Sequence, residues 1–145
     1  MTKNEILRTA EGFEALTASL LDLKEQKLSE IAPLLADGIS AAVAYKNEEL
    51  IPKELCRLLL SLDEYLCFAS FVEQGELLDF HCYQAVSNIA SAIKKGLFEG
   101  GFECIFDVGA PEDYNLSPDR KSILSYLESV KNRTSPRHNG IRIEI

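Results

Sequence analysis

The sequence predicts a mainly α-helical protein, a single domain over residues 1–145 built as a bundle of about five helices with a small two-stranded β element near the C-terminus. Apolar residues recur every three or four positions through most of residues 3–95, which is the period of a helix face. The period shortens to two in residues 102–108 and again in residues 141–145, as in a strand. A chain of 145 residues, 46% hydrophobic and 26% charged, can bury one core without a metal or disulfide.

The first two helices are predicted on either side of a polar segment. An apolar stripe indicates a helix from about residue 3 to the mid-twenties. Residues 24–27 are all polar, so we place a break there. The second helix is expected to begin near Ser29, with Pro33 in or close to its first turn, and to end at about Tyr45. One kinked helix through both segments is the alternative.

The third helix is predicted to begin at Pro52 and to end at Gly75, and it carries two apolar stripes. The first stripe consists of Leu55, Leu58, Leu59, Leu62, Leu66 and Ala69, and the second of Cys56, Leu60, Cys67 and Phe71. Only Arg57, Ser61 and Glu64 remain as a narrow polar edge. We therefore expect this helix to be central.

Two further helices and two strands complete the prediction. The fourth helix follows Gly75 and is expected to stop at Lys94-Lys95-Gly96, because cations and then glycine favour a helix C-terminus. In the fifth, Ser117-Pro118 is interpreted as the N-cap and first residue, and the helix runs to about Asn132. The alternating segments 102–108 and 141–145 can pair, with Glu103 or Asp107 opposite Arg142. Their relative direction is left open, and residues 109–116 and 134–140 are taken as connections.

The chain shows no targeting signal and no stretch of about 18 apolar residues, so we expect a cytoplasmic protein that does not enter a membrane. None of its four cysteines has the C-x-x-C spacing of a metal or redox site. Cys56, Cys67, Cys82 and Cys104 all have apolar neighbours. The interpretation is four reduced core cysteines.

Residues that could perform catalysis are few. The chain has two histidines, His81 and His138, and it lacks a glycine-rich phosphate loop, a nucleophile elbow and a zinc-type helix motif. The spacing of Arg133 and His138 is similar to the arginine–histidine motif of HEPN-type ribonucleases, but the intervening Pro136 interrupts a helix. We therefore predict a protein that is not an enzyme and that uses no cofactor and no metal.

The distribution of charge is the most informative remaining feature. The formal net charge is −8, which argues against nucleic acid as a partner. Residues 58–93 carry a net charge of −5 and residues 96–119 carry −6, each without a single Lys or Arg, whereas residues 120–145 carry +4. Two explanations remain open. The basic end neutralises the acidic middle, or the acidic residues form a patch for a basic partner.

The second explanation leads to a functional hypothesis: a non-enzymatic acidic protein that binds and neutralises a basic protein such as a nuclease toxin, as an immunity protein or antitoxin does. The predicted partner-binding residues are Glu73, Glu76, Asp79, Glu103, Asp107, Glu112, Asp113 and Tyr114. The alternative is a secretion or assembly chaperone or adaptor that binds a partner protein. It would use apolar grooves or donate the strand 141–145 to a partner's sheet.

Overall fold

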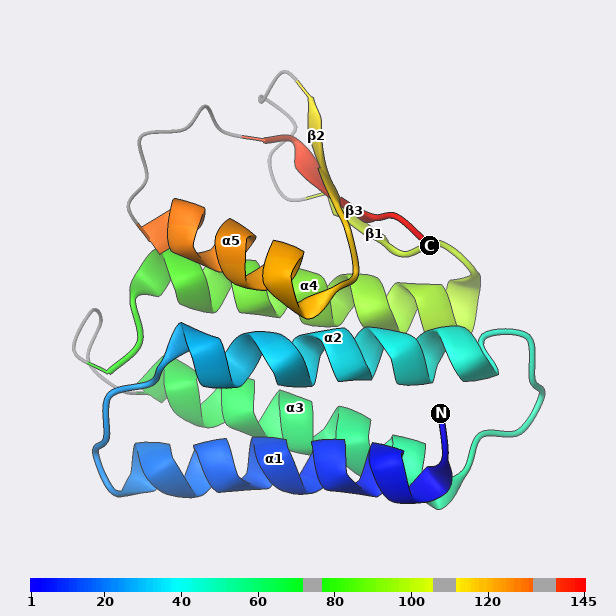
Figure 1. Cartoon of the computed structure of the whole chain (residues 1–145), viewed down its shortest axis with the longest axis horizontal. Coiled ribbons are helices and arrows are strands. Elements are labelled where there is room, and N and C mark those ends of the chain that lie inside the picture. Colours follow the sequence, from blue (N-terminus) through cyan, green and yellow to red (C-terminus); the bar gives the residue numbers. More distant parts are fainter. Residues whose placement is uncertain (72–76, 106–111, 132–137) are drawn as a thin grey trace.

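The computed structural model describes residues 1–71, 77–105, 112–131 and 138–145. Within them the elements are α1 (Lys3–Leu21), α2 (Leu28–Tyr45), α3 (Lys53–Phe71), α4 (Phe80–Glu99), β1 (Glu103–Ile105), β2 (Asp113–Leu116), α5 (Arg120–Lys131) and β3 (Gly140–Ile143) (Figure 1). The predicted mainly α-helical fold, with five helices and a small sheet late in the chain, is confirmed.

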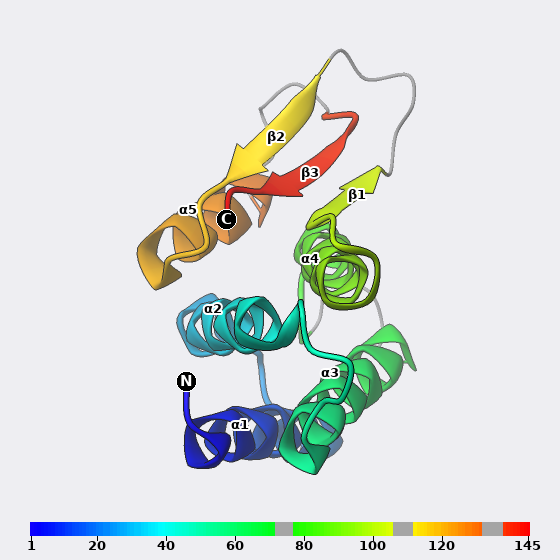
Figure 2. The same cartoon turned by 90° about the vertical axis from the view of Figure 1, so that its right-hand side faces the viewer.

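The helices are stacked in tiers (Figure 2). α1 and α3 lie side by side and run in the same direction, and α2 and α4 form the next tier and run back. α5 packs on α2 and α4, and the sheet packs on α4 and α5. The rings of Phe13 in α1 and Tyr65 in α3 are 6.4 Å apart between centroids and join the lower tier.

The two N-terminal helices are separate, so the kinked-helix alternative is wrong. Thr2 and Glu5 form a capping box at the start of α1, in which each side chain accepts the other residue's backbone N–H, at 3.1 and 2.8 Å. α1 ends at Leu21, earlier than predicted, because the chain turns at Leu23 with φ 57°. Pro33 is the sixth residue of α2, just past the first turn.

The polar segment between α1 and α2 is anchored by Gln26, which is 7% exposed. Its backbone N–H donates to the Leu77 carbonyl oxygen at 2.7 Å, and its side-chain N–H donates to the Lys24 carbonyl oxygen at 2.9 Å. The fully buried Tyr65 hydroxyl donates to Gln26 Oε1 at 3.1 Å. These bonds hold the connection against α3 and against the segment that precedes α4.

α2 is long and apolar enough to cross a membrane by length and composition, with 18 residues and a mean hydropathy of 1.2. The sequence prediction excluded such a stretch. In the structure α2 lies in contact with α1, α4 and α5, and 44% of it is buried. Its Asp37 is paired with Arg120 of α5. These contacts are those of the core helix of a bundle.

The predicted stop of the fourth helix at Lys94-Lys95-Gly96 is wrong, because α4 continues to Glu99. The glycine that ends it is Gly100, whose φ of 89° lies in the left-handed region. Gly96 serves close packing instead, because a Cβ atom there would clash with the ring of Phe102. The predicted start of the fifth helix is also wrong, since Asp119 accepts the Ser122 N–H at 2.8 Å and the helix begins at Arg120.

The sheet has three strands in the order β1-β3-β2, one more than predicted. β2 lies in residues that were expected to form a connection, because its sequence does not alternate clearly. β3 is the central strand, antiparallel to β1 and parallel to β2. The predicted placement of Glu103 opposite Arg142 is confirmed by the register, whereas Asp107 lies outside the described residues.

Candidate functional site

The predicted partner-binding residues do not form one described patch. Glu73, Glu76 and Asp107 lie outside the described residues. Asp79 caps the start of α4, where its carboxylate accepts the Cys82 N–H at 3.1 Å. Glu103 lies in β1, Asp113 and Tyr114 lie in β2, and Glu112 directly precedes β2.

Arg142 of β3 neutralises much of the acidic charge on the sheet. Because β3 is central, its guanidinium reaches both edge strands: Nε lies 3.3 Å from Glu103 Oε2, and an Nη lies 3.3 Å from Asp113 Oδ2. Asn139 also donates to Asp113 Oδ1 at 3.1 Å. Glu112 is exposed. The sheet carboxylates are thus largely engaged by the basic C-terminal segment, as the first explanation of the charge distribution expected.

Tyr114 is half-buried and packs against α5. Its ring centroid lies 4.7 Å from that of Tyr126 and 4.9 Å from that of His138. Tyr114, one of the predicted partner-binding residues, therefore joins β2 to α5. Among the described residues, His138 Nδ1 is buried without a hydrogen-bond partner.

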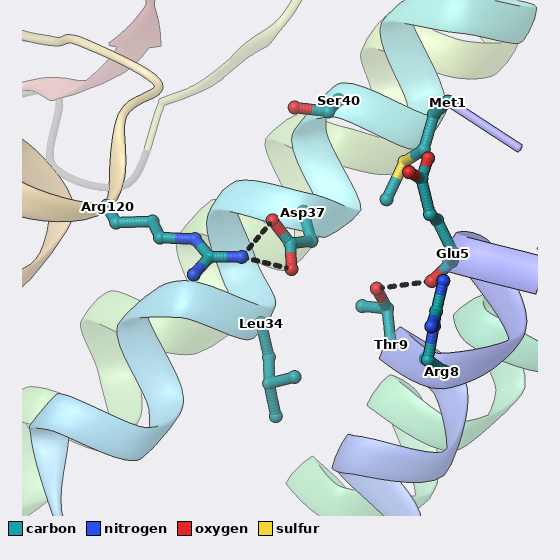
Figure 3. Close-up of a pocket in the computed structure, with 8 residues that line it drawn as sticks. All are labelled: Met1, Glu5, Arg8, Thr9, Leu34, Asp37, Ser40 and Arg120. Carbon is teal, nitrogen blue, oxygen red and sulfur yellow. Dashed lines mark hydrogen bonds and ion pairs between the residues drawn. The ribbon is translucent and has the colours of Figure 1, made fainter.

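A groove of about 570 Å³ lies between the first turns of α1, the middle of α2 and the start of α5 (Figure 3). Its charged residues balance: Glu5 and Asp37 are acidic, and Arg8 and Arg120 are basic. Arg120 donates to both Asp37 oxygens, at 3.1 and 2.9 Å. The groove therefore shows no preference for a cation or an anion. No group of three or more potential metal ligands occurs among the residues that the structure describes.

The most distinctive surface is the solvent side of α3, called here the outer face of α3. It consists of Cys56, Leu60, Asp63, Glu64, Cys67 and Phe71. All six residues are exposed, Leu60 to 69% and Phe71 to 80%. Leu23, at 75%, and Leu50, at 86%, are as exposed but lie in connections, whereas Leu60 and Phe71 belong to one helix face together with two exposed cysteines.

The expectation of a central third helix is therefore wrong. α3 lies at one side of the bundle and packs mainly on α1, with α4 beside it. The first predicted stripe is buried, whereas the second stripe points to solvent. Ser61, expected at the polar edge, is buried and donates to Glu14 of α1 at 2.9 Å. The periodicity showed two apolar stripes but could not show which one would meet the neighbouring helices.

Two ion pairs border the outer face of α3. On one side Arg57 binds Glu14 through two hydrogen bonds of 2.8 and 2.6 Å, and these lower the pKa of the Glu14 carboxyl. On the other side Lys94 of α4 reaches Asp63 at 2.8 Å. Glu64 is exposed and has no ion pair in the described part of the chain. The apolar series is thus interrupted at its middle by two carboxylates, of which one is unpaired.

The cysteines differ from their predicted common burial. Cys82 is buried, and burial raises the pKa of its thiol to about 12. Cys104 is half-buried. Cys56 and Cys67, by contrast, are exposed on the outer face of α3. All four are free cysteines in the structure.

No family model, no curated protein and no solved structure matches this chain.

Proposed function

We propose that this chain is a non-enzymatic acidic protein that binds a basic protein and neutralises it, in the manner of an immunity protein or antitoxin. The observation that carries the proposal is the outer face of α3, where exposed Leu60 and Phe71 stand on either side of Asp63 and Glu64. Buried apolar anchors supply most of the affinity of protein interfaces, and surrounding charge selects the partner.

Electrostatics favours a cationic partner at this face. At the outer face of α3, Arg57 pairs with Glu14 and Lys94 pairs with Asp63, so Glu64 is the carboxylate there without an ion pair among the described residues. The net charge of the whole chain is −8. Such a field accelerates encounter with a basic protein by about 10- to 1,000-fold at low salt. The sheet, where several interface residues were expected, supports the proposal less, because Arg142 already engages Glu103 and Asp113.

Affinity capture from the cells that naturally produce the protein tests the proposal. The bait is the wild-type chain, compared with Leu60→Asp and with a matched control, Ile105→Asp, which adds the same charge at a 59% exposed residue on the sheet. We expect the wild-type and control baits to retain a basic protein that elutes with salt, and the Leu60→Asp bait to lose it. Co-expression should then suppress the activity or toxicity of that protein. Equal retention by all three baits, or an acidic retained protein, would contradict the proposal.

The exposed apolar side chains of α3 also favour a second candidate, a secretion or assembly chaperone or adaptor. Strand donation is an unfavourable route for it, because β3 already pairs with β1 and β2. Limited proteolysis of the complex separates the two functions. A protease-resistant, folded partner supports an inhibitor, whereas a partner cleaved throughout its chain supports a chaperone.

A further inference from the structure

We propose that the outer face of α3 binds an amphipathic helix of the partner, about four turns long, whose apolar side chains stand on either side of a central Lys or Arg. This inference rests on the proposed function and names the segment that α3 recognises.

The geometry of the apolar positions indicates a helical occupant. At 100° per residue, Cys56, Leu60, Cys67 and Phe71 fall within an arc of about 60° on α3. From the first to the last they extend about 22 Å along the axis, or four turns. Helices that pack along each other repeat their contacts every three or four residues, so an apposed helix can meet every one of these side chains.

The charges indicate what must stand at the middle of that helix. Between Leu60 and Cys67 the apolar series is interrupted for one helical turn, where the exposed residues are Asp63 and Glu64. Lys94 pairs with Asp63 at 2.8 Å, as Arg142 pairs with the sheet carboxylates, so the unbalanced negative charge at the middle of the face comes from Glu64. Glu64 is an exposed carboxylate without an ion pair among the described residues. A central cation satisfies this site, whereas an acidic residue placed there is repelled.

The same charges argue against a second copy of the chain. In an antiparallel pair of α3 helices centred between Asp63 and Glu64, Cys56 would face Phe71 and Leu60 would face Cys67. The apolar series therefore matches itself. However, the central turn would bring Asp63 of one copy against Glu64 of the other, and like charges across an interface are strongly disfavoured.

Two synthetic helical peptides test the inference on the full chain. Both carry leucines at the spacing of the apolar positions of α3, and they differ only in having Lys or Glu at the centre. Binding is measured by fluorescence anisotropy, and occupancy of the face by alkylation of Cys56 and Cys67, with Cys104 as the internal reference. We expect the Lys peptide to bind at least about tenfold more tightly, which is about 1.4 kcal/mol, and to protect both thiols. In the Glu64→Lys variant the preference should shift toward the Glu peptide.

Three results would overturn the inference: equal affinity for both peptides, no thiol protection, or an unchanged preference in Glu64→Lys. A dimer in sedimentation that Leu60→Asp dissociates would assign the face to a second copy instead. If neither peptide binds but capture of the partner still requires Leu60, the helical occupant is rejected and the proposed function stands. Loss of that dependence on Leu60 rejects the function itself.

Discussion

Replacing two leucines of α3 by alanine tests the orientation of this helix. Leu58 and Leu60 are two residues apart, and the sequence assigns both to apolar stripes. In the structure Leu58 is 0% exposed and Leu60 is 69% exposed. The two substitutions remove the same atoms from the same helix with the same change in helix propensity, so any difference in stability reports burial alone.

The expected magnitudes differ several-fold. Truncating a fully buried leucine to alanine costs about 2–5 kcal/mol through lost transfer free energy and the cavity that remains. Leu60 keeps only about a third of its surface buried, and full burial of a leucine is worth about 1.5–3 kcal/mol. Alanine also regains a few tenths of a kcal/mol as a better helix former. We therefore expect Leu60→Ala to cost no more than about 0.5 kcal/mol.

Urea unfolding followed by circular dichroism measures both values. The midpoint of Leu58→Ala should fall with an unchanged slope, and that of Leu60→Ala should stay close to wild type. A loss above about 1.5 kcal/mol for Leu60→Ala would mean that Leu60 is buried. The outer face of α3 would then not exist as described, and both the proposed function and the helical occupant would lose their basis.

Three further predictions follow from buried and exposed groups. In the native protein Cys56 and Cys67 should react rapidly with a thiol reagent, whereas Cys82 should react only when the protein unfolds. Mass spectrometry identifies the labelled residues, and rapid labelling of Cys82 in the native protein would contradict its burial. Tyr65→Phe should cost about 1 kcal/mol by leaving a buried amide oxygen without its donor. Burial also raises the pKa of Tyr65. The unfolded tyrosine ionises near pH 10 and the folded one at higher pH, so this group should lower the stability of the wild-type protein above about pH 10 by up to about 1.4 kcal/mol per pH unit. The Tyr65→Phe variant should lose less stability over the same pH range. If the stability of both proteins fell equally with rising pH, the assignment would be refuted. Gly140→Ala should cost about 1–3 kcal/mol in thermal or urea unfolding, because its Cβ would lie 2.5 Å from a backbone carbonyl oxygen of β1; an unchanged midpoint would show that the strands can separate freely.

Local signals predicted the helices well where the sequence is strongly periodic and the ends carry their own caps. The break between α1 and α2 followed from a polar segment. A glycine can end a helix or allow close packing, and the sequence does not distinguish the two. Gly96 was predicted to end the fourth helix, but it lies within α4 where the ring of Phe102 leaves no room for a Cβ atom. β2 has no clear alternation, so its place beside β3 could not be predicted from its own residues.

The candidate site depended on tertiary contacts even more. The sequence showed which residues are acidic, but it could not show that Arg142 would stand between Glu103 and Asp113, because that arrangement requires β3 to be the middle strand. Tyr114 was predicted as a partner-binding residue, yet it packs on Tyr126 and His138.

By itself the sequence determined the helical class, most helix positions, the excess of negative charge and the two apolar stripes of α3, since these depend on residue type and on spacing along one segment. The tertiary structure alone decided which stripe is buried. That choice depends on whether α3 is enclosed by other helices or lies at the side of the bundle, and the bundle places α1 and α4 against one side of it only. The other side, with Leu60 and Phe71, is left to solvent because no described element of the chain covers it.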